Sequence, residues 1–111
     1  MVNIHGMTMY VSGTAEAGVV SGDTLIRFIQ KGSRVMGRYS GGAVTRGCLI
    51  GHLSNDGTLA FRYAQRETSG EVHAGRSICD VIRCDNGKLR ILEHFRWRTK
   101  EGSGTNVFDE L

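Results

Sequence analysis

Turn signals divide this chain at short and regular intervals. Six segments combine Gly with Asn, Asp or Ser, the residue types that tight turns favour; they are QKGSR, YSGGA, SNDGT, ETSGE, CDNGK and KEGSG. The residues between these segments are rich in Val, Ile, Leu, Phe, Tyr and Thr, which favour strands. No segment shows a sustained period of 3.6 residues, so a parallel sheet with crossover helices is excluded.

The segments between the turns predict eight strands. Their expected ranges are Met7–Ser12, Asp23–Lys31, Arg34–Ser40, Val44–Leu53, Thr58–Glu67, Glu71–Cys84, Lys88–Thr99 and Thr105–Leu111. Consecutive strands joined by tight turns form an antiparallel meander, and closure removes the two exposed edges of such a sheet. We therefore predict an all-β fold, an eight-stranded antiparallel up-and-down barrel, with residues 1–111 as a single domain.

The stretch KLRILEHFRW shows the clearest alternation in the chain. One of its rows is largely basic, and the other consists of Leu89, Ile91, Glu93, Phe95 and Trp97. A strand whose two faces differ in this way has one face on a core and the other in water. Glu93 is therefore expected inside the barrel, in an otherwise apolar row.

Alternation in the other strands predicts further polar groups on the inner face. With those of KLRILEHFRW, the inward residues that carry a polar group are Tyr39, Tyr63, Gln65, His73, Ser77, Cys79, Glu93 and Trp97. Four inward glycines, Gly37, Gly47, Gly51 and Gly75, are expected to leave room. Because eight strands enclose an interior that can hold one small ligand, the sequence predicts a partly polar cavity for a small molecule.

Five motifs follow one another in a characteristic order: YSGG (39–42), RGCLIG (46–51), DGTLAFRY (56–63), GEVHAG (70–75) and NGKLRILEHFRW (86–97). This order resembles the short bacterial proteins grouped as an avidin-like domain, many of which carry the label N-acetylglutamate synthase. The resemblance covers about Gly32 to Trp97 and implies a small avidin-like or calycin-like barrel. The residues that match the family pattern are Tyr39, Gly41, Gly42, Gly51, Tyr63, Gly75, Glu93 and Trp97.

The synthase activity is not carried over from this resemblance. Acetyl transfer from acetyl-CoA needs a site for the pyrophosphate, which proteins commonly build from a glycine-rich loop that leads into a helix. The sequence predicts neither such a loop nor a helix to follow it.

Glu93 has a purely structural alternative, in which it is a core carboxylate paired with hydroxyl, Arg or backbone donors. Two functions also fit the predicted cavity. In the first, an enzyme without metal or nucleotide cofactor uses Glu93, helped by His73 or Tyr63, to move a proton in an isomerisation, cyclisation or elimination. In the second, the cavity binds a small molecule without turnover and Glu93 is a hydrogen-bonding anchor. Both hypotheses predict ligand contacts from Tyr39, Gln65, Ser77, Cys79, Phe95 and Trp97.

The cysteine and histidine positions favour no metal site. Cys48, Cys79 and Cys84 show no ligand spacing and are odd in number, so a disulfide framework is not expected. His5, His52 and His94 also lack ligand spacing. We expect a cytoplasmic protein, because its thiols are free and MVNIHGMTMYVSG lacks the features of a signal peptide. It is not expected to enter a membrane, because it has no long apolar run.

The outer rows carry most of the basic residues. Eleven of the 14 basic residues are Arg, and they alternate along several strands. A solvated outer face is the simpler interpretation, and binding of nucleic acid or an acidic partner is the weaker alternative. Some apolar residues also fall in these outer rows, namely Leu25, Ile29, Met36 and Leu92, and they predict a homodimer contact.

Overall fold

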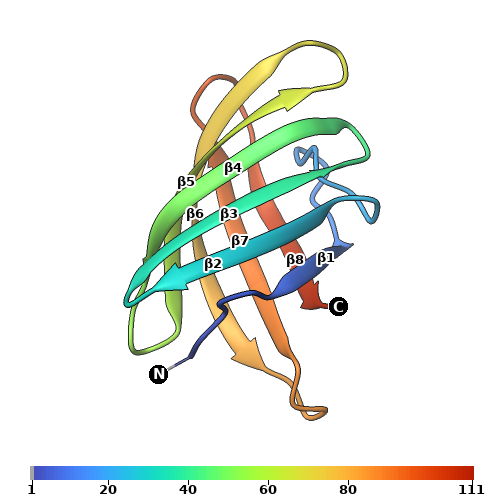
Figure 1. The fold of residues 1–111 in the computed structure, drawn as a ribbon. Helices are drawn as coiled ribbons and strands as arrows, with labels where there is room; N and C mark the ends of the chain where they lie inside the picture. Colours follow the sequence, from blue (N-terminus) through green and yellow to red (C-terminus); the bar gives the residue numbers. More distant parts are fainter. Residues whose placement is uncertain (1) are drawn as a thin grey trace.

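The computed structural model describes residues 2–111 and confirms the predicted barrel (Figure 1). Its strands are β1 (Thr8–Gly13), β2 (Leu25–Lys31), β3 (Arg34–Gly41), β4 (Val44–Leu53), β5 (Thr58–Glu67), β6 (Val72–Arg83), β7 (Leu89–Trp97) and β8 (Ser103–Glu110). Every strand pairs with its neighbours in chain order, and β1 pairs with β8 to close the barrel. Among the described residues, no helix is long and apolar enough to cross a membrane.

The predicted alternation of inward and outward residues matches the alternation of buried and exposed residues in the structure. Along β5, the residues Leu59, Phe61, Tyr63 and Gln65 are buried, and the residues between them are exposed. β7 pairs with β6 and β8 in regular register, so Glu93 lies on the inner face as expected. Only 6% of its surface is accessible to solvent.

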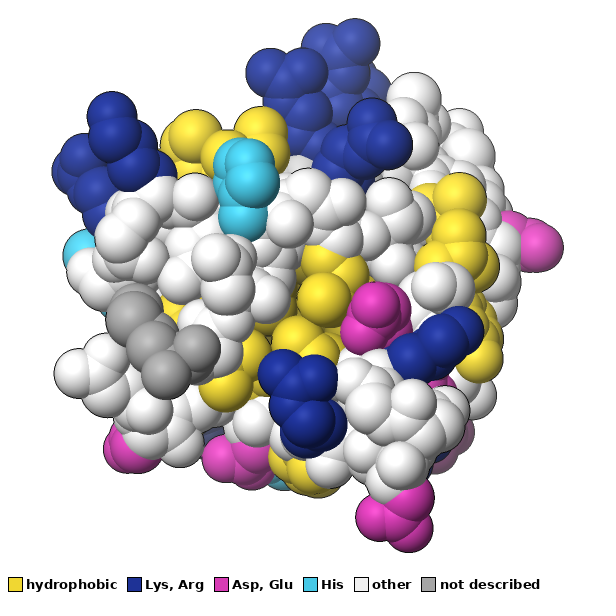
Figure 2. Space-filling model, turned by 60° about the horizontal axis from the view of Figure 1, so that its bottom comes forward, with side chains coloured by type: hydrophobic (Ala, Val, Ile, Leu, Met, Phe, Trp, Pro, Cys, Tyr) yellow, Lys and Arg dark blue, Asp and Glu magenta, His cyan; other side chains and the backbone are white. Residues whose placement is uncertain are grey.

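The arginines occupy the outer face, as their alternation predicts. All 11 are exposed. Figure 2 shows one end of the molecule, where Lys and Arg side chains lie in several separate groups with hydrophobic and acidic side chains between them. On this face the positive charge forms no single continuous patch.

Two segments outside the strands cover the ends of the barrel. At the end that carries both termini (Figure 1), the buried side chain of Ile4 joins the core, and its amide donates to Oε1 of Gln30 at 2.9 Å. At the other end lies the connection between β1 and β2, residues 14–24. The hydroxyl of Thr24 in this connection donates to the carbonyl of Gly41 at 3.1 Å.

Gly41 shows how closely that connection approaches the β3–β4 turn. Its φ is +114°, and a Cβ there would overlap the carbonyl oxygen of Asp23. Glycine is the residue that combines this φ with such an approach. The turn motif YSGG therefore holds the β1–β2 connection over one end of the barrel.

Candidate functional site

A narrow cavity lies inside the barrel, at the end covered by the β1–β2 connection. Its volume is about 30 Å³, which is room for about two water molecules. Most of its wall is apolar or aromatic. The lining residues are Gly18, Val19, Val20, Ile26, Tyr39, Leu49, Phe61, Tyr63, Gln65, Glu93, Phe95, Trp97, Asn106 and Phe108.

Glu93 is the buried acid of this cavity, and both of its carboxylate oxygens accept a hydrogen bond. Ser77 Oγ, on β6, donates to Oε2 at 2.7 Å, and Asn106 Nδ2, on β8, donates to Oε1 at 2.9 Å. Burial raises the pKa of Glu93, while the hydrogen bonds from Asn106 and Ser77 act in the opposite direction. The acid is therefore held in one orientation by the two neighbouring strands.

Asn106 connects this acid to the segment that covers the cavity. While its Nδ2 donates to Glu93, its Oδ1 accepts a hydrogen bond of 3.0 Å from the amide of Ala15. Trp97 Nε1 donates to the carbonyl of Ala17 at 2.9 Å. Two interior side chains thus hold the β1–β2 connection in place beside Gly18, which lines the cavity.

A second hydrogen-bonded chain leads from the cavity to the mouth of the barrel. The hydroxyl of Tyr39 donates to Gln65 Oε1 at 2.9 Å, and Gln65 Nε2 donates to Glu67 Oε2 at 3.0 Å. The carboxylate can only accept, so it fixes the orientation of the Gln65 amide. Burial, followed by the charge of Glu93, raises the pKa of Tyr39.

Tyr63 differs from Tyr39 because its hydroxyl has no hydrogen-bond partner. Among residues 2–111, the Tyr63 hydroxyl is the one buried polar side-chain atom without a hydrogen-bond partner. Burial first, and the charge of Glu93 second, raise the pKa of Tyr63, so its phenol keeps its proton. Its ring packs edge-on against that of Trp97, with 5.3 Å between the centroids. An unpaired buried hydroxyl in a cavity is a natural contact for a ligand.

The inward glycines leave less open space than the sequence suggests. Gly47 pairs across the strands with Tyr39, and Gly75 pairs with Tyr63. A Cβ on Gly47 would overlap the ring of Tyr39, and a Cβ on Gly75 would overlap the hydroxyl of Tyr63. The space above these two glycines is filled by tyrosine rings, and the remaining cavity is correspondingly small.

Most of the site residues predicted from the sequence lie together. The six that line the cavity are Tyr39, Tyr63, Gln65, Glu93, Phe95 and Trp97. Ser77 is buried in the wall and reaches Glu93. Cys79 is also buried, directly across from Glu93 on β6. Burial and then the charge of Glu93 raise the pKa of the Cys79 thiol, which disfavours the reactive thiolate.

His73 lies apart from this group. Its Nδ1 is 2.9 Å from Thr99 Oγ1 and its Nε2 is 3.7 Å from Glu71 Oε1. Within residues 2–111 its ring forms no hydrogen bond with Glu93 or Tyr63. It adjoins the cavity wall at two residues: Gln65 is its cross-strand partner on β5, and its ring approaches that of Trp97 edge-on, with centroids 5.9 Å apart.

Asn106 and the cover formed by residues 18–20 were missed by the sequence analysis. Asn106 alternates with the buried Phe108 in TNVFDE, so period two places it on the inner face. That signal was available, although it does not reveal the hydrogen bond to Glu93. Residues 18–20 lie in an irregular connection, where no periodicity indicates which side chains face inward.

The closed barrel and its interior cavity define the class of protein: a small antiparallel barrel with a narrow, partly polar interior. A family model described as "Avidin-like protein" matches residues 2–111, so the chain belongs to the avidin-like protein family. This confirms the resemblance carried by the motifs and indicates a small-molecule partner. No curated protein and no solved structure matches the chain.

Proposed function

We propose that the protein binds a small organic molecule inside the barrel without converting it, and that Glu93 anchors the polar part of the site. One observation carries this proposal: both oxygens of Glu93 are occupied by fixed donors, Ser77 and Asn106, while the hydroxyl of Tyr63 in the same cavity is unpaired. An acid held in this way is suited to positioning its neighbours. The free hydroxyl of Tyr63 supplies the hydrogen bond to the ligand.

The walls limit the chemistry of the ligand. Phe61, Phe95 and Trp97 offer ring edges and faces, and the cavity has few polar groups. A flat, largely apolar molecule with one hydrogen-bonding group matches such a site, because apolar walls give affinity and a few polar groups give orientation. An anionic ligand would have to leave water beside the buried acid Glu93 and with no basic residue in the cavity wall, which is costly.

Entry of the ligand requires movement of the β1–β2 connection. A cavity of about 30 Å³ is smaller than most organic molecules. The connection is held to the interior by the hydrogen bonds from Trp97 to Ala17 and from Ala15 to Asn106. We therefore infer that binding breaks these two hydrogen bonds and that the ligand takes the place of residues 18–20 against the aromatic wall.

An acid/base enzyme is the second candidate. The observation that favours it is the raised pKa of Glu93, which burial moves toward the range useful for proton transfer near neutral pH. In this reading Glu93 exchanges a proton with the substrate and the protonated phenol of Tyr63 stabilises developing negative charge. His73 would act indirectly, because it adjoins Gln65 and Trp97 but within residues 2–111 forms no hydrogen bond with Glu93 or Tyr63.

A screen of small organic molecules tests the proposal. Binding is detected by thermal shift, and the indole N–H resonance of Trp97 reports entry because this group bonds to the covering segment. Tyr63→Phe removes the proposed contact and should weaken binding about fivefold, the value of one hydrogen bond. Tyr10→Phe is the matched control, since Tyr10 is an outward residue of β1.

Two results would overturn the proposal. Ligands that bind with equal affinity to the wild type and to Tyr63→Phe, and leave the Trp97 resonance unchanged, would place the site elsewhere. Conversion of a bound molecule, abolished in Glu93→Gln with affinity retained, would establish the enzyme instead.

The proposal includes a homodimer formed through the outer wall. Ile29, Met36 and Ile50 are exposed direct neighbours across β2, β3 and β4, and Ile78 extends the same groove. Contiguous exposed apolar side chains of this kind mark interaction sites. Leu92, which was predicted to belong to this contact, is half-buried on β7 and borders Val107 and Asp80 instead.

We also keep the cytoplasm as the proposed location. Its support is the set of three free cysteines, Cys48, Cys79 and Cys84, of which Cys48 is exposed. Free thiols are typical of a reducing compartment. Export of the chain by the cell that makes it would contradict this part of the proposal.

A further inference from the structure

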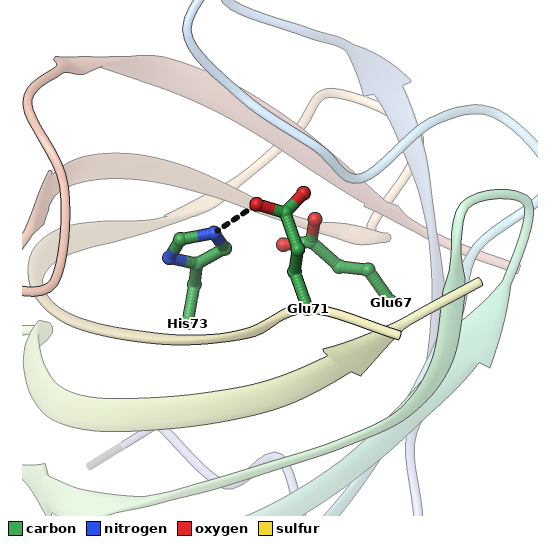
Figure 3. Close-up of side chains that lie close together, drawn as sticks. All are labelled: Glu67, Glu71 and His73. Carbon is green, nitrogen blue, oxygen red and sulfur yellow. Dashed lines mark ion pairs between the residues drawn. The ribbon is translucent and has the colours of Figure 1, made fainter. Parts of the chain in front are cut away.

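Three side chains with metal-ligating groups converge at the hairpin between β5 and β6 (Figure 3). Glu67 ends β5, Glu71 lies in the turn, and His73 follows at the start of β6. One ligand atom from each lies within 4.8 Å of the others. None of these three residues lines the cavity proposed for an organic molecule.

The hairpin fixes the two carboxylates on the same side of the turn. The amide of Glu67 donates to the carbonyl of Glu71 at 2.8 Å, and the amide of Gly70 donates to the carbonyl of Glu67 at 2.9 Å. Glu67 is only 8% exposed, and its Oε2 accepts a hydrogen bond from Gln65, whose side chain lies in the barrel interior. Its other oxygen, Oε1, accepts no hydrogen bond within residues 2–111 and is available to a cation.

His73 is oriented by a residue behind it. Its Nδ1 lies 2.9 Å from Thr99 Oγ1, which also accepts a hydrogen bond of 3.0 Å from the amide of Ala74. In the tautomer whose Nδ1–H donates to Thr99, Nε2 carries the lone pair and lies 3.7 Å from Glu71 Oε1. Histidine ligands of metals characteristically donate their second N–H in this way, because it fixes the ring and its tautomer.

The cluster lacks a basic partner. Among residues 2–111, neither Glu67 nor Glu71 forms an ion pair with Lys or Arg. Lys100, in the β7–β8 turn, contacts the ring of Trp97 instead, with its Nζ 4.5 Å from the ring centroid. A buried carboxylate is normally paired or bound to a metal, so Glu67 beside a second carboxylate calls for a cation.

We propose that Glu67, Glu71 and His73 form a binding site for a divalent first-row transition-metal ion, of which Zn²⁺ is the best match. Two carboxylates and an imidazole suit Zn²⁺, whereas Mg²⁺ and Ca²⁺ favour oxygen ligands alone. Ligand atoms about 2.1 Å from an ion are at most about 4.2 Å apart, so small side-chain rotations close the site. Three protein ligands leave a coordination position for water.

The site is also linked to the cavity by the hydrogen-bonded chain described above. Glu67 contacts Gln65, and Gln65 contacts Tyr39, which lines the cavity. A cation on Glu67 fixes the position of this carboxylate and therefore holds the Gln65 amide in its present orientation. The metal site thus fixes one part of the cavity wall, whichever molecule the cavity binds.

Titration with Zn²⁺ tests the site in the purified chain at neutral pH. Isothermal calorimetry should give one ion per chain, with Mg²⁺ giving no comparable signal. Glu71→Gln and His73→Asn should each weaken Zn²⁺ binding about tenfold or more. Glu71 has 67% of its side chain exposed, so its variant is expected to fold normally.

His94→Asn is the matched control. The Nδ1 of His94 lies 2.9 Å from Thr105 Oγ1 and its Nε2 lies 3.4 Å from Asp80, so it has the same surroundings with one carboxylate fewer. Zn²⁺ binding should be unchanged in this variant. Absence of binding to the wild type, unchanged affinity in Glu71→Gln, or an equal loss in His94→Asn would each overturn the proposal. So would a thiolate absorption band with Co²⁺, because it would place the ion on a cysteine.

Discussion

Asn106 donates a 2.9 Å hydrogen bond to the buried carboxylate of Glu93 from the neighbouring strand, and the opposite end of its amide accepts from the backbone of Ala15. Each partner requires the orientation that the other imposes, because a carboxylate only accepts and a backbone N–H only donates. The interior acid and the segment that covers the cavity are therefore coupled through the orientation of one side-chain amide, that of Asn106.

Glu93 should make the stability of the barrel depend on pH. Burial raises its pKa above the ordinary value of 4.5, so over the window between the two values the folded chain holds a proton that the unfolded chain releases. The free energy of unfolding contributed by this group therefore falls as pH rises through that window. Glu93→Gln removes the effect, and its gain in Tm over the wild type should be larger at pH 8 than at pH 4.

Glu101→Gln is the control for this experiment, because Glu101 is an exposed turn residue. Its difference in Tm from the wild type should be small at both pH values. A Glu93→Gln variant that is less stable at pH 8 than at pH 4, relative to the wild type, would contradict the assigned direction.

The two cavity tyrosines should respond in opposite ways to loss of the hydroxyl. Tyr63→Phe removes an unpaired buried group and should stabilise the fold by about 1 kcal/mol. Tyr39→Phe leaves Gln65 Oε1 without its donor and should destabilise by about 1 kcal/mol or more. Urea unfolding of both variants measures the difference, and equal effects would show that the two hydroxyls have equivalent surroundings.

Two inward glycines should not tolerate alanine. A Cβ at Gly51 would overlap the backbone of Ala60 and Phe61, which cannot move without distorting the sheet, so Gly51→Ala should cost about 3 kcal/mol. Gly47→Ala should cost less, about 1 to 2 kcal/mol, because the ring of Tyr39 can shift.

Gly22→Ala is the reference for these variants. Its φ is not in the left-handed region, and the nearest atom to an added Cβ is 3.8 Å away. A change within about 0.5 kcal/mol is expected in urea unfolding. If Gly51→Ala were equally mild, the strand spacing at Gly51 would be wider than described.

Trp97→Phe should loosen the cover of the cavity. The substitution keeps an aromatic ring but removes the hydrogen bond to Ala17, which is worth about 1 kcal/mol. Hydrogen exchange of the Ala15 and Gly18 amides should become about fivefold faster, while the amides of β4 and β5 keep their rates. Unchanged exchange at Ala15 would mean that Asn106 alone holds the connection.

The proposed dimer contact predicts an unusual dependence on salt. Lys31, Arg34, Arg62 and Arg76 surround the apolar groove, so a second copy brings like charges together. Added salt should therefore strengthen dimerisation in sedimentation experiments, because it screens this repulsion.

Two substitutions locate the contact. Ile50→Lys should give a monomer, since Ile50 lies in the middle of the apolar row. Ile82→Lys should not, although Ile82 is also exposed, because it lies outside the groove on β6. A monomeric wild type at all salt concentrations would remove the homodimer from the proposed function.

The sequence was sufficient for the fold because the fold depends on local, repeated signals. Turn glycines and period-two alternation determine both the strands and their inner faces, which is how Glu93 and Tyr63 could be placed correctly. The partners of these residues depend on the register between neighbouring strands. Ser77 and Asn106 are 16 and 13 residues from Glu93, and no local pattern reports those distances. The prediction that the inward glycines leave room was wrong for the same reason, because Tyr39 fills the space at Gly47 only once β3 and β4 are paired.

The seam between β1 and β8 sets the order in which this chain can fold. Each of the other strand pairs is a local hairpin or, for β1 and β2, a slightly longer loop, whereas Met9 must find Glu110 at the opposite end of the sequence. Closing so long a segment costs about 2 kcal/mol more than closing a short hairpin. The nascent barrel therefore remains an open sheet, with β1 exposed as an edge that other strands can pair with, until β8 has been synthesised.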